Sequence, residues 1–122
     1  MYEVILKRFE KSDQVRVFDK GRFELVHVGG MTIGRARYEP GWKWLVHVGQ
    51  ALGKTSCDVE HVGIVLAGRA TAAMDDGRIV EMKPGDLFYI ELGRDSRVVG
   101  DEPYVSLHLM GASDYAAHKP AN

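Results

Sequence analysis

The side chains with the most chemical potential in this sequence are one thiol and several imidazoles. Cys57 is the only cysteine, and His61 follows it by four positions, so one interpretation is a Cys–His pair for nucleophilic catalysis. Asp58 lies directly beside Cys57, and its negative charge disfavours a reactive thiolate. No oxyanion-hole signature accompanies the pair. We therefore predict that Cys57 is a small buried or inert residue.

Two tryptophans offer a large aromatic surface. Trp42 and Trp44 lie two positions apart, so on one strand they would share a face. Such a pair can wall a ligand pocket, form a dimer contact or pack in the core, and the sequence leaves these three roles open.

The elements that must position these residues are short β-strands. Apolar and β-branched runs are separated by glycine, proline and Asp-Gly signals about every 8 to 12 residues, which is typical of a sandwich or barrel. Gly29-Gly30 and Asp76-Gly77 supply the positive φ angles of tight hairpin turns, so neighbouring strands are expected to be antiparallel. The predicted strands are 23–28, 31–38, 43–48, 62–66, 70–74, 78–82, 87–90, 97–99 and 104–109.

Composition indicates one globular domain over residues 1–122. The chain is 45% hydrophobic and 27% charged, and 16 basic and 17 acidic residues are interspersed, which argues against nucleic-acid and membrane partners. Residues 1–20 are expected to form an extension with an extra strand and a turn, and residues 112–122 a loose tail. A single cysteine fits a reducing compartment, so we expect a cytoplasmic protein.

The segment 40–100 resembles the two sequence motifs of the cupin superfamily. The first motif, G(x)5HxH(x)3-4E(x)6G, is matched by Gly41, His47 and Gly68, while Gly49 replaces its second histidine and His61 stands at its glutamate position after an insert. The resemblance implies an all-β, single-domain fold, an antiparallel β-barrel or jelly roll with a pocket in its mouth.

The second motif, G(x)5PxG(x)2H(x)3N, retains only its two glycines. Gly85 and Gly93 match, whereas Ser96 replaces the histidine and Gly100 the asparagine. The phrases EPGWKW, HVGIVLAGR, MDDG and VVGDEP are similar to a subgroup of small bacterial cupins that usually have Gly-His-Asp where this chain has Gly-Arg-Asp. Arg94 therefore replaces a further imidazole. Its planar, permanently charged guanidinium would bind a carboxylate or phosphate, or would form a surface ion pair with a neighbouring acid.

The resemblance also implies a metal hypothesis. His47 and His61 would supply two ligands for a divalent transition metal (Zn, Fe, Ni or Mn). Cys57 would be the third ligand, which residue type and rough position in the barrel suggest and no motif does. His108, His27 and Glu60 are alternatives for that third position.

Two functions from different classes follow. The first is a small-molecule-binding cupin, for a ligand of anionic character, with Arg94, Trp42, Trp44, His47 and His61 around the pocket. The second is a metal-dependent cupin enzyme of isomerase, oxygenase or lyase type that uses His47 and His61 as ligands. An N-terminal strand that extends a partner's sheet would make the protein a homodimer.

Overall fold

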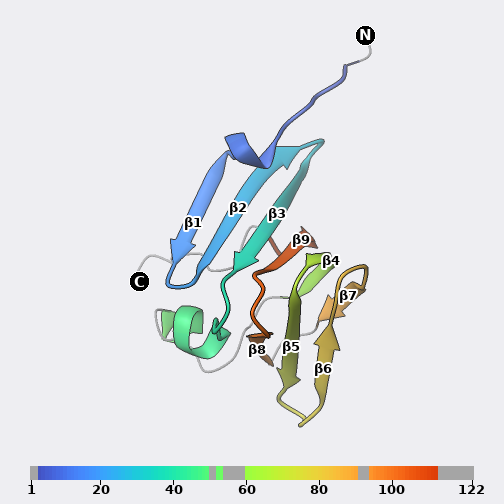
Figure 1. Cartoon of the computed structure of the whole chain (residues 1–122). Coiled ribbons are helices and arrows are strands. Elements are labelled where there is room, and N and C mark those ends of the chain that lie inside the picture. Colours follow the sequence, from blue (N-terminus) through green and yellow to red (C-terminus); the bar gives the residue numbers. More distant parts are fainter. Residues whose placement is uncertain (1–2, 50–51, 54–59, 91–93, 113–122) are drawn as a thin grey trace.

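The computed structural model describes residues 3–49, 52–53, 60–90 and 94–112, except for the side chain of Arg94. Its elements are almost all antiparallel strands (Figure 1). In chain order they are the 3-10 turn η1 (Phe9–Lys11), β1 (Gln14–Phe18), β2 (Gly21–Val28), β3 (Met31–Tyr38), the π-helical turn η2 (Leu45–Gly49), β4 (His61–Ala67), β5 (Arg69–Met74), β6 (Ile79–Met82), β7 (Leu87–Ile90), β8 (Arg94–Val99) and β9 (Tyr104–Met110).

The strands form two sheets. The larger has six strands in the order β1-β2-β3-β9-β4-β7, and the smaller has three in the order β6-β5-β8. Strand β9 lies between β3 and β4, so it pairs on both sides with strands that come much earlier in the chain. This crossover decides which side chains meet at the site described below.

The core lies between the two sheets. One buried cluster contains Phe23, Tyr38 and Val65 from the large sheet together with Ala70 and Val98 from the small sheet. A core shared by two antiparallel sheets with crossing connections is the architecture of a jelly roll, which confirms the predicted fold class.

Local sequence signals predicted most of the strands correctly. The strands 31–38 and 87–90 have their predicted bounds. Each of the other predicted strands, apart from 43–48, begins and ends within three residues of its predicted bounds. The Gly29-Gly30 turn joins β2 to β3, and Gly77, at φ 94°, lies in the turn between β5 and β6. β1 is the extra strand expected within the first twenty residues.

The predicted strand 43–48 is wrong. Lys43 makes a single bridge to Arg97, and the chain then turns into η2. The backbone N–H of Leu45 donates to the Asp95 carboxylate at 2.9 Å, and the N–H of His47 donates to the Lys43 carbonyl at 2.9 Å. These hydrogen bonds satisfy the backbone without a strand partner, which outweighs the β-propensity of the valines.

Residue 112, where a loose tail was predicted to begin, is packed against the rest of the protein. Ala112 is buried in the core, and its carbonyl accepts a hydrogen bond from Arg16 at 3.3 Å, while residues 113–122 lie outside the described part. Within the described residues, no helix has the length and apolar character to cross a membrane.

Candidate functional site

Two buried histidines from different strands are in contact with each other. His61 begins β4, His108 lies in β9, and both side chains are almost completely buried. Their Nδ1 atoms are 3.1 Å apart, and the rings meet edge to face with centroids 4.6 Å apart. An N···N distance of 3.1 Å is a hydrogen bond in which one imidazole donates and the other accepts.

A line of polar side chains on β9 continues from this pair. Tyr104, Ser106 and His108 alternate along the strand, so all three point into the core. The Ser106 hydroxyl is 3.0 Å from Nε2 of His108, and the Tyr104 hydroxyl shares a hydrogen bond with Ser106. Burial raises the pKa of Tyr104 to about 12, so its phenol stays protonated over the physiological range. A hydrogen-bonded chain therefore runs from Tyr104 to His61.

Two glycines make room for His108. It is paired with Gly34 on β3 and with Gly63 on β4. A Cβ at Gly34 would lie 2.4 Å from the ring of Phe23, and one at Gly63 would lie 2.7 Å from the ring of Phe88. These two phenylalanine rings instead pack edge to face on His108, with centroids 5.2 and 5.8 Å away. The imidazole is thus held in one orientation by an apolar clamp.

A small, partly open cavity lies beside the histidine pair. Its volume of about 30 Å³ is enough for one or two atoms of ligand or water. His61, His108 and Ser96 line it together with Trp42 and Trp44. Among the described residues, Nε1 of Trp42 is buried without a hydrogen-bond partner. One of the residues that line the cavity therefore carries a buried N–H donor without a partner in the described part of the chain.

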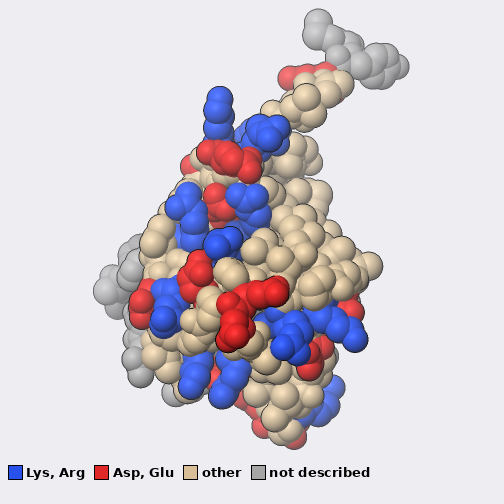
Figure 2. Space-filling model, in the orientation of Figure 1, with Lys and Arg blue, Asp and Glu red and all other residues tan. Residues whose placement is uncertain are grey.

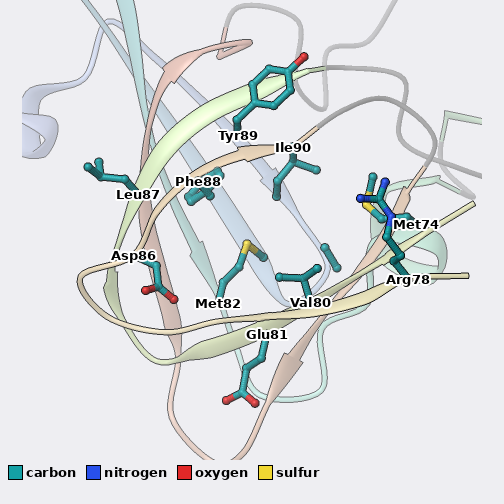
Figure 3. A pocket seen from close by; sticks show the side chains of 11 residues that line it. Met74, Arg78, Val80, Glu81, Met82, Asp86, Leu87, Phe88, Tyr89 and Ile90 are labelled. Atoms are coloured by element: carbon teal, nitrogen blue, oxygen red, sulfur yellow. The ribbon is translucent and has the colours of Figure 1, made fainter. Parts of the chain in front are cut away.

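A larger open groove lies outside this cavity, between β6 and β7. Its volume is about 490 Å³. Figure 3 shows Val80 and Met82 of β6 pointing toward Phe88 and Ile90 of β7, while Glu81 points away from them. Met82, Phe88 and Ile90 line the inner cavity as well. These three side chains, which we call the apolar wall, separate the groove from the histidine pair.

Three charged residues, Arg78, Glu81 and Asp86, line the groove. Arg78 donates to the Asp76 carboxylate at 2.7 Å. A backbone N–H donated by Arg78 and the guanidinium itself hold the pKa of Asp76 below its usual value. On the face seen in Figure 2, basic and acidic side chains alternate without a continuous basic patch.

The structure separates the residues predicted for the pocket. Trp42, Trp44 and His61 line the inner cavity, and neither tryptophan lies in a strand. His47 does not line it, because its Nδ1 bonds to the backbone of Lys43 and its Nε2 is 3.4 Å from the Asp19 carboxylate.

Two other predicted site residues fall on parts that the structure does not describe. Cys57 lies outside the described residues. Arg94 begins β8, where its backbone pairs with Met74, a residue that lines the groove, but its side chain is not described.

The described donors do not fit a metal centre of the predicted kind. Such a centre needs about three nitrogen, oxygen or sulfur ligands and an open position. Within the described ranges, no three His, Cys, Asp or Glu side chains converge. Both ring nitrogens of His108 are engaged, one by His61 and one by Ser106. The metal hypothesis for His47, His61 and Cys57 stays a prediction.

Sequence reasoning named His108 only as an alternative ligand and missed Ser106, Gly34 and Gly63. One signal was available: residues 104–108 alternate polar and apolar side chains within a predicted strand, which places Tyr104, Ser106 and His108 on one face. The glycines carried no such signal, because their role depends on which strands pair.

Comparisons with known proteins agree with this architecture. No protein-family model matches the chain, and neither does any curated protein sequence. Solved structures do match. A protein of unknown function from Rhizobium leguminosarum bv. viciae superposes with a TM-score of 0.62 at 21% identity, covering 89% of this chain and 97% of that one.

Two matching structures have described activities. Ectoine synthase from P. lautus matches with a TM-score of 0.63 at 9% identity, over 91% of this chain and 83% of that one. A sugar phosphate isomerase of the cupin superfamily from Silicibacter pomeroyi matches with a TM-score of 0.58 at 17% identity, over 84% and 73%. The chain therefore has the jelly-roll fold of the cupin superfamily, as its glycine pattern predicted.

Proposed function

We propose that this cupin-fold protein binds a small molecule in the groove between β6 and β7. The apolar part of the ligand would lie on Val80, Met82, Phe88 and Ile90, one polar group would face the inner cavity, and an anionic group would lie at the outer edge of the groove. The observation that carries the proposal is the apolar wall, since the same three side chains line both spaces. A groove of about 490 Å³ also lies within the usual size range of small-molecule sites.

Strand register supports an anionic group on the ligand. Arg94 pairs through its backbone with Met74, which lines the groove, so the strand that begins with this arginine runs beside the groove. The adjacent Arg78 is already bonded to Asp76 and is less available. A sulfonate, carboxylate or phosphate at the groove rim would gain a charge-assisted hydrogen bond from Arg94.

The proposal is tested with 1-anilinonaphthalene-8-sulfonate, a probe with an apolar body and one anionic group. Titration followed by fluorescence should show one site per chain. Val80→Glu places a carboxylate in the groove and is expected to weaken binding by a factor of about ten or more, because an unpaired charge would face apolar surface.

Ile79→Glu is the matched control. Ile79 precedes Val80 on β6, is 73% exposed and does not line the groove. Equal probe binding in the two variants, or equal loss in both, would place the probe elsewhere and remove the proposed site.

A further inference from the structure

The buried polar chain on β9 and β4 has a property that simple ligand binding does not require. Tyr104, Ser106, His108 and His61 can each donate one hydrogen bond and accept another. In one arrangement Tyr104 donates to Ser106, Ser106 to Nε2 of His108, and Nδ1 of His108 to Nδ1 of His61. That arrangement puts the remaining proton of His61 on its Nε2.

The opposite arrangement satisfies the same contacts. Nδ1 of His61 donates to Nδ1 of His108, Nε2 of His108 donates to Ser106, and Ser106 donates to Tyr104. Nε2 of His61 then carries a lone pair instead of a proton. Both arrangements fit the observed distances of 3.1 and 3.0 Å, so either neutral tautomer of His61 is compatible with the same heavy-atom positions.

We infer that the inner cavity is a proton-transfer site, in which His61 is the acid–base group and His108, Ser106 and Tyr104 are positioning residues. The inference rests on the proposed function, because the ligand must reach the cavity from the groove. Nδ1 of His61 is bonded to His108, so Nε2 is the nitrogen that would exchange a proton with the ligand. In the arrangement with an unprotonated Nε2, His61 would accept that proton, become an imidazolium held by His108, and return the proton from the same nitrogen.

A second group in the cavity indicates the substrate class. Nε1 of Trp42 is a buried N–H donor with no partner among the described residues, and the ring is fixed by stacking on Tyr38 at 3.8 Å. A fixed donor beside a base stabilises an oxygen that becomes negative as a neighbouring C–H loses its proton. We therefore assign the site to a small carbonyl compound with an acidic C–H next to the carbonyl.

The step balances without a further reactant. The C–H proton moves to Nε2 of His61, the C–H electron pair forms a C=C bond, and the carbonyl π pair moves to the oxygen that Trp42 bonds. Return of the proton to the same or a different carbon regenerates His61 and gives hydrogen exchange or isomerisation. The apolar wall must move for a carbonyl to enter, and the flexible Met82 is the side chain suited to this.

The experiment uses 5-nitrobenzisoxazole, an apolar carbon acid that opens in one base-dependent step. A base removes its ring C–H proton, the C–H pair completes a nitrile, and the N–O pair leaves on oxygen as a coloured phenolate. We expect the protein to accelerate this reaction about 100-fold or more over free imidazole at the same concentration. His61→Gln should remove that acceleration, and Trp42→Phe should reduce it.

His27→Gln is the matched control. His27 is an exposed imidazole on β2 whose Nδ1 contacts Thr32, so its loss should leave the rate unchanged. No acceleration by the wild-type protein, or an undiminished rate in His61→Gln, overturns the inference. Retained binding of 1-anilinonaphthalene-8-sulfonate in His61→Gln shows that the groove proposal survives independently.

A spectroscopic readout tests the positioning residues and does not depend on turnover. With 15N-labelled histidine at pH 8, one of the two facing Nδ1 atoms should be protonated and the other not. His108→Phe, which fits the clamp of Phe23 and Phe88, should shift the tautomer ratio of His61. The hydrogen-bonded chain is contradicted if both Nδ1 atoms are protonated or if both are unprotonated. It is also contradicted if the tautomer ratio of His61 is unchanged in His108→Phe. The wild-type spectrum decides even if the variants do not fold.

Discussion

Tyr104 is expected to make the stability of this protein fall steeply at alkaline pH. Its hydroxyl is buried, and burial raises its pKa from 10.0 to about 12 in the folded chain. The folded state therefore holds the phenol proton more tightly than the unfolded state does. The corresponding stability is fully present below pH 10 and is lost as pH rises from 10 through about 12, because the unfolded chain then gains from ionisation.

The magnitude follows from the two pKa values. The difference between the folded and unfolded pKa values is worth about 3 kcal/mol in full, and about half of it is lost by pH 11. Urea unfolding of wild type and Tyr104→Phe at pH 8, 9, 10 and 11 measures it. The difference in unfolding free energy between the two proteins should stay constant to pH 9 and should shift by about 1 kcal/mol against the wild type at pH 11.

Tyr89→Phe is the matched control, since the chain has five tyrosines and other groups also titrate above pH 10. Tyr89 is 56% exposed and contacts the Glu60 carboxylate at 2.8 Å. The Tyr89→Phe variant should lose as much unfolding free energy between pH 9 and pH 11 as the wild type does. A parallel pH dependence for wild type and Tyr104→Phe would refute the argument that burial holds the Tyr104 proton.

Three further predictions follow from the same structure. Gly63→Ala should destabilise the fold by about 3 kcal/mol in urea unfolding, because its Cβ would lie 2.1 Å from the Leu107 carbonyl oxygen. Gly30→Asn is the control: Gly30 lies in open space at φ 76°, so this variant should lose under about 1 kcal/mol of stability. Asp13 accepts hydrogen bonds from the backbone N–H of His27 and from the Lys7 ammonium, and both lower the pKa of Asp13. Its contribution to stability is therefore present above its pKa in the unfolded chain and is lost as pH falls through its pKa in the folded chain. Thermal unfolding from pH 7 to 3 should show a smaller decline for Asp13→Asn than for wild type, and identical profiles would exclude this role. Arg94→Gln should weaken 1-anilinonaphthalene-8-sulfonate but not its uncharged analogue N-phenyl-1-naphthylamine; an equal effect on both would argue against anion recognition.

Sequence reasoning was least successful where a side chain or a distant strand overrides local preference. The motif spacing selected His47, and its valine neighbours predicted a strand. The Asp95 carboxylate, 50 positions from Leu45, caps that backbone instead, and the chain turns helically. His47 then contacts Asp19 and lies outside the cavity lining. No pattern local to residues 43–48 contains this information.

The sequence by itself predicted most of the strands and the hairpin turns, and its resemblance to the cupin motifs indicated the jelly-roll class. Alternation of apolar side chains and the positive φ angles open to glycine act within a few residues, so they can be read without knowing the fold. The tertiary structure alone decided the site. His61 and His108 are 47 positions apart, and they meet only because β9 pairs with β4 in a register that sets Gly63 opposite His108. Such a register depends on how two sheets bury their apolar faces together, which is a property of the whole chain.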